Sequence, residues 1–237
     1  FSQPKRKTIP YDSGESGKDA KAYLTVNWML PPGDDPTLVL GLGILDHILL
    51  GTPASPLRKM LIESGLGEDV VGQGMEKELK QMAFSTGLRG IELENVDKVE
   101  TFIIDALMEI AQKGIDPKTI EASLNTIEFN LRENNTGSYP RGLLLMLRAL
   151  STWLYDLDPT VSLAFEKPLQ QIKQKFENGE RYFENLIQTY FLQNQHRVTV
   201  ILTPDEKLGK QRAEKEKQRL LTVRSNLDPG EVKAIID

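Results

Sequence analysis

The stretch from Pro36 to Leu50 constrains the fold most, because it is apolar around nearly its whole circumference when written as a helix. Asp35 is a good helix cap and Pro36 suits a first helical turn, so together they predict where the helix begins. A helix without a polar side has to be buried in nearly every direction. Its only strongly polar members, Asp46 and His47, therefore need partners inside the protein.

Alternating apolar side chains predict strands before and after this helix. Residues 22–30 place an apolar side chain at every second position, and the run ends at Pro31-Pro32-Gly33. Apolar residues at period two, broken by glycines, predict two or three further strands between residues 70 and 90. The alternation over residues 198–202, in front of Pro204, predicts a last strand.

Apolar residues at three-four spacing predict the remaining helices. These are expected over residues 57–63, 96–113, 117 to about 133, 141–154, 168–177 and 180–192. The order of strand, helices, strands, helices and strand predicts an α+β fold, with a mostly antiparallel sheet and helices packed on one face. Residues 1–20 are expected to be a linker, residues 21–205 the folded domain, and residues 206–237 the start of a helical hairpin connector.

Composition excludes several kinds of site. The 237 residues contain no cysteine, which excludes disulfides, thiol nucleophiles and Cys-ligated metals. Lys+Arg 29 against Asp+Glu 34 gives a net charge of -5, so we expect no nucleic-acid partner. We expect no membrane partner either, because no apolar run is long enough to span a bilayer. Phosphate-loop, dinucleotide and nucleophile-elbow patterns are also missing from the sequence.

Three blocks of sequence carry a family resemblance. The first reads LDHILLGTPASPLRK and then ESGLG within residues 45–67, the second NTIEF and LRENNTGSYPRG within residues 125–142, and the third WLYDLDP at residues 153–159. They resemble the second domain of presequence proteases, in the pitrilysin and insulinase clan of zinc peptidases. The resemblance covers roughly residues 22–204, and it implies that residues 21–205 are an inactive peptidase-like domain. It implies the clan's α+β fold and a place in the N-terminal half of a larger enzyme.

The helix that corresponds to the clan's active site lacks most of the required residues. In an active domain the motif HxxEH places two histidine ligands on one helix face, and its Glu activates water. Gly43, Asp46 and His47 stand at these positions here. Glycine offers no ligand atom, and the distant Glu121 and Glu128 leave fewer than three protein ligands. The resemblance thus implies no catalytic residue and no bound metal in this chain, with zinc held by the catalytic domain of the parent enzyme.

Other candidate residues carry weaker signals. Tyr139, Arg141 and Trp153 are candidates for contacting a peptide, because aromatic and Arg side chains are common anchors at binding surfaces. Core and capping roles are the alternative for these three. His47 is expected to hydrogen-bond near Asp46 or to a backbone carbonyl. His196 is expected to be an exposed loop residue.

The expected function is that of a non-catalytic domain that helps to form the chamber of a zinc metalloendopeptidase degrading unfolded peptides, such as cleaved targeting peptides. Expected partners are the catalytic domain and C-terminal half of the same enzyme and the peptide. The fragment alone is expected to self-associate through an uncovered apolar face. The resemblance implies a mitochondrial matrix or plastid stroma in a eukaryote, or the cytoplasm of a bacterium. The alternatives are an adaptor that binds a partner through its charged C-terminal helix, and an independently active metallohydrolase.

Overall fold

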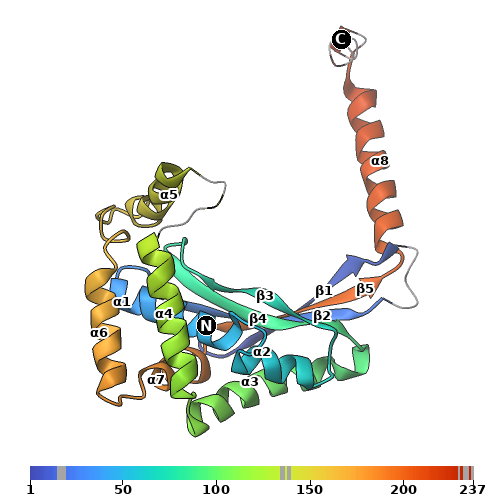
Figure 1. The fold of residues 1–237 in the computed structure, drawn as a ribbon. Helices are drawn as coiled ribbons and strands as arrows, with labels where there is room; N and C mark the ends of the chain where they lie inside the picture. Colours follow the sequence, from blue (N-terminus) through green and yellow to red (C-terminus); the bar gives the residue numbers. More distant parts are fainter. Residues whose placement is uncertain (15–19, 134–136, 138–139, 229, 232–234, 236–237) are drawn as a thin grey trace.

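The computed structural model describes residues 1–14, 20–133, 137, 140–228, 230–231 and 235. Within them, five strands form one sheet in the order β1-β5-β2-β4-β3, and helices cover one of its faces (Figure 1). The strands are β1 (Lys5–Asp12), β2 (Ala22–Pro32), β3 (Asp69–Glu76), β4 (Gln81–Ile91) and β5 (Arg197–Asp205). β1 pairs with β5 in parallel, and the other neighbours are antiparallel. The expected α+β class is confirmed.

The helices form close to their predicted positions. They are α1 (Pro36–Leu50), α2 (Pro56–Glu63), α3 (Val96–Lys113), α4 (Pro117–Glu133), α5 (Arg141–Trp153), α6 (Glu166–Glu177), α7 (Tyr182–Ile187), the π-helical turn η3 (Gln188–Leu192) and α8 (Leu208–Asn226). A short 3-10 turn, η2 (Leu93–Asn95), precedes α3. Asp35 caps α1 as predicted, because its Oδ1 accepts hydrogen bonds from the amides of Thr37 at 2.9 Å and Leu38 at 3.2 Å.

The hydrophobic core lies between the sheet and the helical layer. β2 points Leu24, Val26 and Trp28 into it. α1 has six buried residues and no exposed one, in line with its predicted burial. The indole Nε1 of Trp28 donates to the backbone oxygen of Phe191 at 2.9 Å, so the largest buried side chain leaves no polar atom unpaired. This contact ties the central strand to η3 and fixes the helical layer against the sheet.

The amino-terminal segment differs from expectation. Residues 1–20 are expected to be a linker, but Lys5–Asp12 forms strand β1 and pairs along its length with β5. The linker prediction is therefore wrong for these 8 residues. The sequence did not indicate this strand because β1 lies at the sheet edge and has many charged side chains. Only Ile9 and Tyr11 are half-buried, so no apolar alternation marks it. The Tyr11 hydroxyl donates to the backbone oxygen of Lys21 at 2.7 Å and fastens β1 to the sheet.

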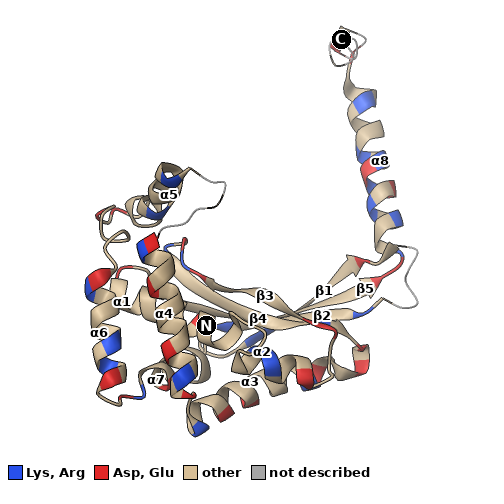
Figure 2. Ribbon diagram, viewed as in Figure 1, with Lys and Arg blue, Asp and Glu red and all other residues tan. Residues whose placement is uncertain are grey.

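The second face of the sheet has no helical cover in the part of the chain that the structure describes (Figure 1). α5 stands at one end of the molecule, and α8 projects from the opposite end. Every residue of α8 from Lys210 to its end is exposed, and Lys and Arg recur along the helix (Figure 2). No described helix has the length and apolar character needed to span a bilayer.

Candidate functional site

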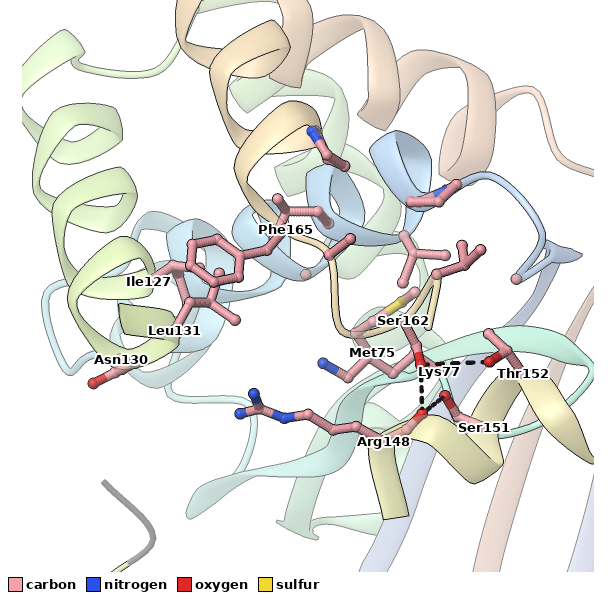
Figure 3. A pocket seen from close by; sticks show the side chains of 18 of the residues that line it. Met75, Lys77, Ile127, Asn130, Leu131, Arg148, Ser151, Thr152, Ser162 and Phe165 are labelled. Atoms are coloured by element: carbon pink, nitrogen blue, oxygen red, sulfur yellow. Dashed lines mark hydrogen bonds between the residues drawn. The ribbon is translucent and has the colours of Figure 1, made fainter. Parts of the chain in front are cut away.

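A pocket of about 330 Å³ opens beside the degenerate motif, between α1, the end of β3, α4 and α5. Such a volume is at the small end for ligand sites. Its apolar wall includes Val39, Met75, Ile127, Leu131 and Phe165. Its polar side chains include Asp46, Lys77, Asn130 and Arg148, most of which are labelled in Figure 3. We call this cavity the motif pocket, because Gly43 also lines it.

Asp46 is the acid of the motif pocket, and it lies against the backbone of β3. Its Oδ1 is buried and has no hydrogen-bond partner among the residues that the structure describes. Burial raises the pKa of Asp46 to about 6, and the Met75 backbone and the charge of Lys77 offset part of this effect. Gly74 permits the close approach, because it has a φ of +64 and a Cβ there would lie 2.4 Å from Asp46 Oδ1.

Two cations share the pocket with this acid. Lys77 follows β3 and Arg148 belongs to α5, and in Figure 3 both side chains extend toward the side where Asn130 of α4 lies. Lys77 is exposed at the mouth of the pocket, but the protein around its ammonium removes part of its hydration. This desolvation and the charge of Arg148 lower the pKa of Lys77, while nearby carboxylates act in the opposite direction. Neither cation forms an ion pair with any residue that the structure describes.

The backbone that carries Arg148 is held by a hydroxyl network. The Oγ atoms of Ser151 and Ser162 donate to the Arg148 carbonyl at 2.7 and 2.8 Å (Figure 3). Thr152 donates through Oγ1 to the backbone oxygen of Asp158 at 3.2 Å. The segment after α5 thus folds back onto that helix and places Arg148 at the pocket.

The remaining motif residues do not assemble a metal site. His47 turns toward α4 and is hydrogen-bonded through Nδ1 to Ser123 Oγ at 3.0 Å, so its predicted partner was wrong. Glu121 is exposed, and Glu128 accepts hydrogen bonds from Lys173 and Arg132, which lower the pKa of that carboxyl. No group of three His, Asp or Glu side chains suited to a metal occurs among the described residues. This donor set does not fit the zinc that the clan resemblance implies for active domains.

The weaker candidates do not converge on the pocket. Arg141 is exposed and donates to the Glu133 backbone oxygen at 2.7 Å, and Trp153 is 63% exposed at the end of α5. Tyr139 lies outside the described residues, and contact of these three with a peptide stays a prediction. His196 was expected to be exposed, but it is half-buried. The ring of Phe1 packs edge-on against its imidazole, with 4.5 Å between the ring centroids.

Sequence comparison agrees with this geometry. Residues 2–127 match the family described as "Peptidase M16 inactive domain". The chain belongs to this family. The inactive domain is 47% identical over 229 residues to presequence protease 1, chloroplastic/mitochondrial, of Arabidopsis thaliana, with 95% of the chain and 21% of that protein covered. It is 34% identical to protein HypA of Clostridium perfringens, with 100% of the chain and 24% of that protein covered. The inactive domain thus spans about a fifth to a quarter of these relatives.

Solved structures share the fold of this inactive domain. The inactive peptidase domain of a Bordetella parapertussis protein described as a zinc protease has a TM-score of 0.62 at 17% identity, covering 79% of the chain and 93% of that structure. The ferredoxin protease FusC, solved as its E83A mutant with Arabidopsis ferredoxin, has a TM-score of 0.62 at 15% identity, covering 87% of the chain and 21% of that structure. At these identities the likeness concerns the fold alone. The family match, and not these structures, identifies the chain as a peptidase M16 inactive domain.

Proposed function

We propose that this inactive domain forms part of the wall of a peptide-degrading chamber and leaves catalysis to another domain of the same enzyme. The observation that carries the proposal is that α1 holds the degenerate motif without a set of metal ligands. α1 delivers one carboxylate to the motif pocket, offers no ligand at Gly43, and turns His47 onto Ser123. A domain that keeps the peptidase fold without a ligand set is suited to packing and to substrate contact.

The uncovered surfaces support this role. The sheet face opposite the helices is open between α5 and α8 (Figure 1). α5 also exposes a group of large apolar side chains, which with its last turn comprises Leu143, Met146, Leu147, Trp153 and Leu154. Exposed apolar surface of this kind marks an interaction site. The matched relatives are several times longer than this chain, so they contain further protein to cover such a surface.

Names of the relatives suggest the substrate. Several are presequence proteases, and the FusC structure contains a bound ferredoxin. We therefore propose an unfolded peptide, such as a cleaved targeting sequence, as the substrate of the whole enzyme. By the same reasoning we propose a mitochondrial or plastid location if the source is a eukaryote and a cytoplasmic one if it is a bacterium.

A chimeric enzyme tests the proposal. This chain would replace the matching segment of the Arabidopsis presequence protease 1, to which it is 47% identical. We expect the chimera to cleave an unfolded peptide, and the same protease with the segment deleted to be inactive. A chimera as inactive as the deletion would contradict a structural role in the chamber.

The purified chain provides the second arm of this test. We expect it to contain no stoichiometric zinc by elemental analysis and to leave the peptide uncut. Stoichiometric metal together with cleavage would instead support the independently active metallohydrolase.

A further inference from the structure

We propose that the motif pocket binds a carboxylate of a peptide chain through Arg148 and Lys77, with the neighbouring apolar side chain of the peptide against the pocket wall. This inference rests on the proposed function, because it assumes that the domain meets peptide substrates. It assigns a binding role to the place where active relatives carry out catalysis. The degenerate position would then be an anchoring site for substrate.

The first argument is charge. Arg148 is half-buried and Lys77 lies beside it, and neither has an ion-pair partner in the described chain. Two neighbouring cations repel each other, and an anion placed between them removes that repulsion. A guanidinium presents a planar fork of donors that matches a carboxylate in two hydrogen bonds, which an ammonium next to it can supplement.

The second argument is the shape and polarity of the cavity. The cationic end adjoins an apolar wall that includes Val39, Ile127 and Phe165. A free inorganic anion would leave this wall in contact with water. The end of a peptide fits better, because an apolar side chain of the peptide can pack against the apolar wall while the carboxylate of the peptide pairs with the two cations. The Asn130 amide, at the same side of the pocket, can hydrogen-bond the adjoining peptide group.

The third argument is the position of Asp46, which gives the site a pH dependence. The charged lining residues are Asp46 of α1, Lys77 after β3 and Arg148 of α5, and α4 contributes no charged residue to the lining. Ionised Asp46 repels a bound carboxylate and competes for the cations. Because the pKa of Asp46 is about 6, binding should strengthen as the pH falls from 7.5 to 5. A peptide carboxylate stays largely ionised over this range.

The test is a binding titration of the 237-residue chain with three fluorescent peptides that share an unstructured, apolar-ended sequence. One has a free C-terminal carboxylate, one a C-terminal amide, and one an amide with an Asp side chain next to the end. We expect the free-carboxylate peptide to bind at least about 10-fold more tightly than the amide, as for loss of a charge-assisted pair. If the Asp peptide binds as well as the free acid, the carboxylate source is a side chain.

Variants locate the site. R148Q and K77Q should abolish the preference for the carboxylate, whereas K80Q, which removes an exposed cation after the same strand but outside the pocket lining, should preserve it. D46N should tighten binding at pH 7.5 and remove the pH dependence. Thermal unfolding of each variant checks that it is folded.

Three outcomes would overturn the inference. These are equal binding of acid and amide peptides, a carboxylate preference that persists in R148Q and K77Q, and no binding of any of the peptides. None of them bears on the chimera experiment, so failure of this inference and failure of the chamber role are distinguishable.

Discussion

At the scale of single residues, Asp46 shows burial acting against charge. Burial raises its pKa from the ordinary 3.8 to about 6, so the folded protein favours the protonated acid. Ionisation at neutral pH therefore opposes folding. The penalty is fully present above pH 6, declines as the pH falls, and is absent below 3.8.

D46N should remove this penalty. We expect the variant to exceed the parent in free energy of unfolding by about 1–2 kcal/mol at pH 7.5, with the difference shrinking toward pH 4. Urea unfolding at several pH values measures it. D105N, which changes an exposed aspartate of α3, should stay within about 0.5 kcal/mol. A D46N variant less stable than the parent at pH 7.5 would contradict the conclusion that ionised Asp46 destabilises the fold.

Two glycines in α1 provide a matched pair. A Cβ at Gly43 would have nothing within 4 Å, whereas a Cβ at Gly41 would lie 2.3 Å from the Tyr182 hydroxyl oxygen. G43A should therefore stabilise the protein by about 0.5–1 kcal/mol through helix propensity, and G41A should destabilise it. Urea midpoints compare the two. Equal changes in the free energy of unfolding for G43A and G41A would contradict the conclusion that Gly41 is closely packed and Gly43 is not.

At the scale of elements, the two ends of the chain contribute unequally to stability. β1 pairs with β5 along its whole length, although its composition is that of a linker. α8 buries no residue, and its one ion pair among the described residues joins Arg219 to Glu216 of the same helix at 2.7 Å. The stability of the domain should therefore depend on β1 and not on α8.

Truncation measures this difference. A chain ending at Lys207 should unfold within about 0.5 kcal/mol of the parent, because exposed positions contribute little. Removal of residues 1–12 should lower the thermal midpoint by several degrees, because it exposes the apolar residues of β5 along a new sheet edge. Calorimetry of both truncated chains measures which one has the lower thermal midpoint. A lower midpoint for the chain without α8 than for the chain without β1 would contradict this prediction.

At the scale of the whole molecule, the structure has a covered side and an uncovered side. The helical layer encloses one face of the sheet, while α5 presents Leu147 and Leu154, 46% and 68% exposed, without cover in the described chain. Apolar surface left open in this way drives association. The isolated chain should therefore self-associate at high concentration.

Sedimentation velocity over a range of concentrations tests this prediction. The pair L147K/L154K should shift the chain toward monomer, and L93K, which changes an exposed leucine in η2, should not. A parent chain that stays strictly monomeric at high concentration would contradict the claim that the exposed apolar side chains of α5 drive self-association.

Most elements could be predicted because their signals are local. The cap at Asp35, the apolar periodicity of α3 and the glycine that ends it at Gly114 act within a few residues of the helices that they define. The loss of the zinc motif at Gly43 was likewise evident from residue type alone. In contrast, β1 had no local signal, because its strand geometry depends on pairing with β5, nearly two hundred positions later.

By itself, the sequence determined the fold class, the approximate positions of the helices and the missing ligand at Gly43, because these follow from spacing and side-chain chemistry. Only the tertiary structure decided which polar groups meet. It turned His47 onto Ser123 and brought Lys77 and Arg148, 71 residues apart by their numbers, to the same pocket as Asp46. The reason is physical: no local propensity specifies contacts between distant segments, which arise only when the sheet and helices pack around a common core.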